Sequence, residues 1–138
     1  MKRTLFVLAL LAPGLTFVSG CHSEHGAYAP QKTTVNNLED RAPFVLFDEG
    51  AQRSVTCSGI QVQRLPDGRL QLAANVRNRE NRRIQVQINC VFKDAQGFVV
   101  EETPFQNLFL DENALENVRF VSMNDKAQRY TIRVRQAR

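Results

Sequence analysis

The sequence predicts an all-β domain, an immunoglobulin-like antiparallel β-sandwich, and two features of the chain support this class. Apolar and polar residues alternate with period two over several stretches, which is typical of strands with one buried and one solvated face. Turn signals separate these stretches, and none is both long and helically periodic. We expect the sandwich to span residues 43–138, after a signal peptide at 1–20 and a flexible tether at 21–42.

Four alternating stretches, near residues 70–76, 84–93, 117–120 and 130–135, predict the main strands. Their apolar positions are expected to face the core: Leu70, Leu72, Ala74, Val76, Ile84, Val86, Ile88, Cys90, Phe92, Val118, Phe120, Tyr130, Ile132 and Val134. The polar positions between them are expected to face solvent: Gln71, Asn75, Arg77, Gln85, Gln87, Asn89, Lys93, Asn117, Arg119, Thr131, Arg133 and Arg135.

Turn chemistry punctuates the strands. Pro66-Asp67-Gly68 predicts a tight hairpin, because glycine readily adopts the positive φ that such turns require. Further turns are expected at 78–82, 94–97, 111–113 and 124–126. Val55 and Cys57 are out of phase with Ile60, so a β-bulge is expected at Ser58-Gly59. The segment 48–52 could form one helical turn.

The N-terminal segment is typical of a bacterial lipoprotein signal peptide. Lys2 and Arg3 precede an apolar run over 5–18, which is shorter than the roughly 20 residues that a transmembrane helix needs. Val18-Ser19-Gly20-Cys21 has the form of a lipobox, which predicts cleavage before Cys21 and acylation of that cysteine. An ordinary cleaved signal followed by a coincidental cysteine is the alternative.

The residue after the cysteine bears on location. Aspartate there favours retention in the inner membrane, whereas this chain has His22, so we expect the outer membrane, facing the periplasm. Cleavage would remove Lys2 and Arg3, so the formal net charge falls from +4 to +2. The remaining charge is too small to indicate a nucleic-acid partner, and the lipid anchor makes the membrane a partner.

Two cysteines remain once Cys21 carries lipid. An oxidising compartment permits a single disulfide between Cys57 and Cys90, and their core-facing phases also allow two buried free thiols. A reactive redox pair is not favoured, because reactive thiols need exposed electropositive surroundings.

The stretch 70–97, LQLAANVRNRENRRIQVQINCVFKDAQG, resembles the YcfL-like family of periplasmic lipoproteins. The features that carry the resemblance are a strand ending in asparagine, at Asn78, and a Phe-x-Asp-x-x-Gly ending, at Phe92, Asp94 and Gly97. A later asparagine-rich turn and final strand over 124–135, with Ala127, is also similar. The resemblance implies an immunoglobulin-like sandwich and a setting in the cell envelope, and it brings no established activity.

Catalytic chemistry is not expected. Both histidines, His22 and His25, belong to the tether, where nothing would orient them as a base or fix them on a metal ion. The acidic pairs Glu101-Glu102 and Asp111-Glu112 are interpreted as solvated rim. We therefore expect no enzyme, no metal and no cofactor.

Arginines form the more informative pattern. Arg77, Arg79, Arg82 and Arg83 crowd one hairpin turn, and further arginines follow the last strand, Tyr130 to Arg135, which we expect to be a sheet edge. Arginine matches carboxylate and phosphate geometry, so these residues are candidate contacts for an anionic partner: Arg79, Arg82, Arg83, Arg133 and Arg135. The alternative is charge that keeps an edge and a turn soluble.

Together these observations favour a non-catalytic binding or assembly module of the cell envelope, anchored in the outer membrane. Its partner would be an envelope protein or a peptidoglycan-related molecule, and an exposed strand edge would support this function. The alternative is a periplasmic ligand carrier or minor hydrolase, which would need a deep pocket with convergent polar groups.

Overall fold

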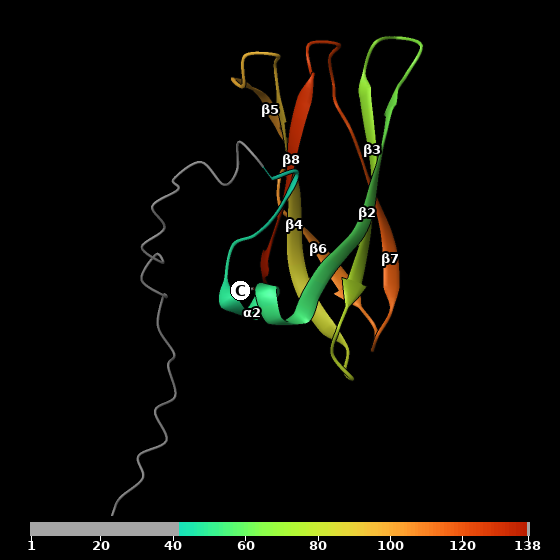
Figure 1. The fold of residues 1–138 in the computed structure, drawn as a ribbon, viewed down its shortest axis with the longest axis vertical. Helices are drawn as coiled ribbons and strands as arrows, with labels where there is room; N and C mark the ends of the chain where they lie inside the picture. The colour runs from blue at the N-terminus through green and yellow to red at the C-terminus, as the bar shows by residue number, and fades with distance from the viewer. Residues whose placement is uncertain (1–41, 138) are drawn as a thin grey trace, which may run out of the picture.

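The computed structural model describes residues 42–137, which form two β-sheets and one short helix (Figure 1). The predicted signal peptide, Cys21, His22, His25 and the tether up to Arg41 lie outside the described residues. The elements are β1 (Phe44–Leu46), α2 (Glu49–Ser54), β2 (Val55–Arg64), β3 (Leu70–Asn78), β4 (Ile84–Lys93), β5 (Val99–Glu102), β6 (Gln106–Leu110), β7 (Leu115–Val121) and β8 (Arg129–Gln136). Among these residues, no helix is long and apolar enough to cross a membrane.

The predicted fold class is confirmed: the chain is an all-β sandwich of two mainly antiparallel sheets. The five-stranded sheet has the order β1-β8-β4-β5, and β6 also pairs with β4. The three-stranded sheet has the order β2-β3-β7. Every pair is antiparallel except β1 with β8, whose short parallel register runs from Phe44 opposite Ile132 to Leu46 opposite Val134.

The core fills the space between the sheets, and the alternation in the sequence predicts most of it. Leu72, Ile88 and Phe92 are fully buried. Other core residues come from the same inward positions: Ala74, Val76, Val86, Cys90, Val118, Phe120, Ile132 and Val134. Ile84 and Tyr130 are only partly buried and pack against this core. Burial of these apolar side chains is the main favourable contribution to folding.

Three local features predicted from the sequence are confirmed: a hairpin turn, a β-bulge and a short helical turn. The hairpin turn after β2 contains Gly68 with a φ of 86°. The register of β2 on β3 shifts between Cys57 and Gly59, which is the predicted bulge. The predicted helical turn is α2, whose first turn is capped by Asp48: its carboxylate accepts a hydrogen bond from the Ala51 N–H at 2.8 Å.

Two short strands that the alternation did not predict, β5 and β6, lie on the same edge of β4, on either side of Pro104. β5 pairs with Val91–Lys93 and β6 with Ile84–Ile88. Pro104 has no N–H for a ladder, so the pairing breaks there. Thr103 bridges the break, because its hydroxyl accepts a hydrogen bond from the Cys90 N–H at 2.9 Å.

Two further expectations were wrong. The last strand, β8, is not an edge: it lies between β1 and β4, because a parallel strand that the alternation did not reveal covers its outer side. Asn89, Lys93 and Thr131 were expected to be solvated but are buried. The Asn89 side-chain amide donates to Glu102 Oε1 at 3.0 Å and to the Thr103 carbonyl at 3.2 Å.

Candidate functional site

The longest open feature of the described domain is the free edge of β2. This ten-residue strand pairs only with β3 among residues 42–137, so one side of its backbone has no strand partner. Gln61, Val62, Gln63 and Arg64 are all exposed, and the strand carries no charge before Arg64. Natural edge strands are usually protected by lysine, proline or a strong bulge. β2 has only its bulge at Cys57–Gly59, so it can accept an added strand.

Arg64 closes the upper end of this edge. Its guanidinium donates to the carbonyls of Gly68 and Ala127, at 2.6 and 3.0 Å, and to the Gln128 side chain. These bonds tie the β2–β3 hairpin to the loop before β8. The last charged residue of the strand therefore serves the fold, and the segment below it stays open.

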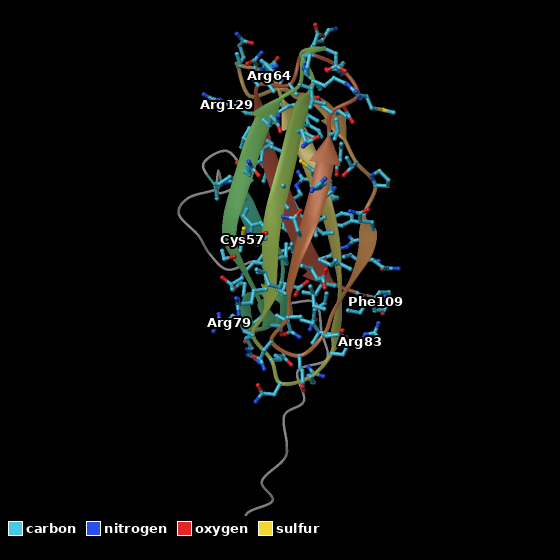
Figure 2. All side chains as sticks on the ribbon, turned by 90° about the vertical axis from the view of Figure 1, so that its right-hand side faces the viewer. Cys57, Arg64, Arg79, Arg83, Phe109 and Arg129 are labelled. Carbon is cyan, nitrogen blue, oxygen red and sulfur yellow. The ribbon has the colours of Figure 1, made fainter. Side chains whose placement is uncertain are left out.

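The predicted basic turn is partly neutralised. Arg82 pairs with Glu80, and Arg83 lies 3.3 Å from the Asp111 carboxylate and stacks over the Phe109 ring, as their side-by-side position in Figure 2 shows. Hydrogen bonds from Arg82 and then Ser54 hold the pKa of Glu80 below its usual range, so Glu80 carries a negative charge. Arg79 differs from its neighbours, because no carboxylate pairs with it among residues 42–137.

The two candidate arginines of β8 are engaged on the outer face of the five-stranded sheet. Arg133 pairs with Glu102 at 2.9 Å, stacks over Phe47, and has a side chain only 17% exposed. Arg135 donates to the Gln87 side chain at 2.9 Å and stacks 3.8 Å from the centre of the Phe105 ring. The structure thus gives Arg133 and Arg135 partners within the fold.

Two arginines of the three-stranded sheet were not among the candidate contacts from the sequence, which grouped Arg77 with the basic turn and gave Arg119 only as a solvated position. Arg77 on β3 and Arg119 on β7 are exposed on its outer face, and no carboxylate pairs with either one within the described residues. The outward phase of both was visible in the sequence. The missing signal was the strand order, which places Arg77 opposite Thr56 and Leu115, and Arg119 opposite Ala73.

Cys57 and Cys90 are free thiols and form no disulfide in the structure, and of the two only Cys90 is buried. Cys90 is buried, and burial raises the pKa of its thiol to about 12. Cys57 is half-buried beside the bulge, where its thiol turns back to the Gly59 carbonyl at 3.5 Å. Burial also raises the pKa of Cys57, so neither thiol is activated as a nucleophile.

A polar cavity of about 200 Å³ lies at the lower end of the five-stranded sheet, beside α2. Its lining is formed by Gly50, Ser54, Arg82, Arg83, Ile84, Gln85, Val86 and Gln136. Among the described residues, this lining contains no histidine, cysteine or carboxylate that could serve as a general base. Within residues 42–137 no group of three histidine, cysteine or acidic side chains could hold a metal ion.

The motif residues that resemble the YcfL-like family make contacts within the fold. The buried Asn78 amide donates to the carbonyls of Arg82, Leu110 and Asp111, and its oxygen accepts from the Glu80 N–H. It therefore joins the end of β3 to the end of β6, across the two sheets.

The turn after β4 is stabilised by the motif residues Asp94 and Gly97. The Asp94 carboxylate accepts from the Phe98 N–H at 2.9 Å, and Gly97 has a φ of 94°. Phe92 and Ala127 are fully buried. These motif residues stabilise the fold and identify no ligand.

The geometry defines a small β-sandwich domain with an open sheet edge and no assembled catalytic centre in its described part. The chain belongs to the DUF1425 family, a family of proteins of unknown function, whose model matches residues 44–136. No curated protein matches the chain.

Solved structures share this fold. The Campylobacter jejuni protein cj0090 is 16% identical with a TM-score of 0.58, and the match covers 69% of this chain and 98% of that one. A DUF1425 family member from Shewanella sp. pv-4 is 23% identical with a TM-score of 0.55, covering 61% and 79%. At these identities the likeness establishes the fold alone.

Proposed function

We propose that this protein is an outer-membrane lipoprotein of the YcfL-like type, acylated at Cys21, whose sandwich domain is a non-catalytic binding and assembly module in the periplasm. The lipobox and the short apolar N-terminal run support the anchor. Two or three acyl chains, at about 0.8 kcal/mol per buried methylene, would hold the protein on the membrane.

The observation that carries the binding function is the free edge of β2. An extended segment of an envelope protein would pair with this edge as an added strand. Backbone hydrogen bonds would then provide affinity, and alternate side chains would provide specificity. Within β2, Gln61, Val62 and Gln63 are uncharged and exposed, which are the properties such an addition needs. The partner is thus a polypeptide with an extended segment, and no nucleic acid is involved.

The ligand carrier or hydrolase is less well supported. Pockets for small molecules are usually about 300–1,000 Å³ and largely apolar. The polar cavity beside α2 is about 200 Å³ and its arginines already contact Glu80 and Asp111.

The anchor is tested by mass spectrometry of the mature protein. Acyl mass on the N-terminal peptide beginning at Cys21 is expected, and Cys21→Ala should release the domain from the membrane or leave an uncleaved precursor. Wild-type protein without acyl mass, with unchanged membrane fractionation of the variant, would overturn the anchor.

The edge is tested by photo-crosslinking in intact envelopes, with a photoreactive residue at Gln61. The double variant Ser58→Lys/Gln63→Lys places two charges on the edge strand and should abolish the crosslinks. The matched control, Gln71→Lys/Asn75→Lys, places the same charges on the central strand β3 and should keep them. Equal crosslinking in the edge variant and the wild type would exclude strand addition at β2.

A further inference from the structure

Within residues 42–137, no carboxylate residue occupies an outward-facing position of the three-stranded sheet. Register aligns its residues in rows across β2, β3 and β7. From the upper to the lower end, the rows are Gln63-Gln71-Val121, Gln61-Ala73-Arg119, Gly59-Asn75-Asn117 and Thr56-Arg77-Leu115. Its only charged members are Arg77 and Arg119, and Arg79 follows at the lower end of β3, as Figure 2 shows. This surface, here named the arginine–amide face, carries net positive charge.

The two arginines are set apart by the sheet geometry. Arg119 lies opposite Ala73 on the neighbouring strand, four residues along β3 from Arg77. With a rise of about 3.4 Å per residue and about 4.8 Å between strands, their Cα atoms are about 14 Å apart. A compact anion would contact only one of them, whereas an extended anionic polymer would contact both.

Amide side chains fill the space between the arginines. Asn117 Nδ2 donates to Asn75 Oδ1 at 2.9 Å, which leaves Asn75 a free amide donor and Asn117 a free acceptor. Gln61 and Gln71 flank the small side chain of Ala73. Each amide both donates and accepts, as a sugar hydroxyl does, so the rows match a chain of hydroxyl groups. Gly59 and Ala73 leave the middle of the face without bulky side chains.

We propose that the arginine–amide face binds a carboxylate-bearing glycan strand, with Arg77 and Arg119 each pairing with a carboxylate and the amides contacting hydroxyl groups. Arginine binds carboxylates through parallel N–H···O bonds, and such charge-assisted bonds are stronger than neutral ones. The inference deepens the proposed function and depends on it only for the periplasmic setting.

Other partners fit this face less well. A peptide strand added at β2 would lie about 4.8 Å beyond that strand, so Arg77 and Arg119 would be two and three strand spacings away. A lipid surface would require apolar side chains in the centre of the face, but its exposed apolar residues, Leu115 and Val121, lie at two corners.

The test measures binding of fluorescent oligoguluronate, a glycan with a carboxylate on every sugar, to the full-length protein in a neutral detergent. Wild-type binding should weaken as salt rises, because the charge pairs are exposed and screened. Arg77→Gln/Arg119→Gln should lower the affinity by about tenfold or more, equivalent to about 1.4 kcal/mol. The control, Arg53→Gln/Arg129→Gln, removes the same net charge elsewhere and should stay within about twofold.

Three results would overturn the inference: no binding of oligoguluronate to the wild type, an equal loss in the control variant, or tighter Arg77-dependent binding of polyglutamate or of anionic lipid vesicles. Uncharged chitohexaose should bind at least tenfold more weakly than oligoguluronate. Arg77→Gln/Arg119→Gln should keep the crosslinks from Gln61, because neither arginine lies on the β2 edge, so failure of strand addition and failure of glycan binding are distinguishable.

Discussion

The five-stranded and three-stranded sheets both present arginines on their outer faces, but they place them in different surroundings. On the five-stranded sheet, Arg133 meets Glu102 and Phe47, and Arg135 meets Gln87 and Phe105. On the three-stranded sheet, Arg77 lies between Thr56 and Leu115, and Arg119 lies opposite Ala73, all of them uncharged neighbours. A guanidinium with a carboxylate or ring beside it contributes to the fold, whereas one surrounded by uncharged groups is available to a partner. Position relative to neighbouring strands, more than charge, therefore separates the two roles.

The two sheets also differ at their edges. In the five-stranded sheet, β1 covers β8, and β5 and β6 together cover β4. In the three-stranded sheet, β2 is long and its outer side has no strand partner within residues 42–137. Both properties that favour recognition, an open edge and solvated arginines, thus occur on the same sheet.

The largest loss of stability is expected from a substitution at Asn78, where the two sheets are joined. Asn78→Ala removes the buried amide that donates to the carbonyls of Arg82, Leu110 and Asp111, and it should lower the free energy of unfolding by about 3 kcal/mol. Urea denaturation measures the loss. Asn75→Ala, on the solvated side of the same strand, should cost less than about 0.5 kcal/mol. Similar losses in the two variants would show that Asn78 does not join the sheets.

A smaller difference in stability should distinguish the arginines of the two sheets. Arg133→Gln breaks the pair with Glu102 and the stack on Phe47, at a side chain that is mostly buried, and should cost about 2 kcal/mol. Arg119→Gln should change stability by less than about 0.5 kcal/mol, because exposed charges contribute little. Thermal and urea unfolding of both variants provide the comparison. An equal cost at the two positions would remove the distinction between the sheets.

Cys90 should give a pH dependence of stability. Its folded pKa is raised to about 12 by burial, while an unfolded thiol titrates near about 8.5. Below about pH 8.5 both states hold the proton, and above it the unfolded state loses the proton first. Stability therefore falls as pH rises through this window, by about 1 kcal/mol between about pH 8 and 9.5.

Cys90→Val is the control for this titration, since it keeps Cys57 and every other group. Urea denaturation at the two pH values should show a shallower decline in the variant than in the wild type. Parallel declines would mean that Cys90 is not protonated in the folded state through this range.

Much of the fold could be predicted because its signals are local. Alternation predicted the inward residues of β3, β4, β7 and β8. Glycine in two polar segments predicted the turns at Gly68 and Gly97, and both glycines have positive φ in the structure. These features depend on residues within a few positions of one another. The parallel pairing of β1 could not be predicted in this way, because three residues show no clear period.

The site was harder to predict because it depends on contacts distant in sequence. Arg133 meets Glu102 and Arg83 meets Asp111 across strands whose register the sequence does not reveal. For the same reason the solvated arginines, Arg77 and Arg119, could not be separated from the paired ones. The lipidation of Cys21 remains a prediction.

The most direct test of the account is nitrogen-15 relaxation at the arginine Nε groups of the full-length protein. We expect Arg133 and Arg135 to be ordered, with order parameters near about 0.8, and Arg77 and Arg119 to be mobile, below about 0.6. Ordered Nε groups on the three-stranded sheet, with mobile ones at Arg133 and Arg135, would contradict the central claim that the two sheets divide structural and recognition roles.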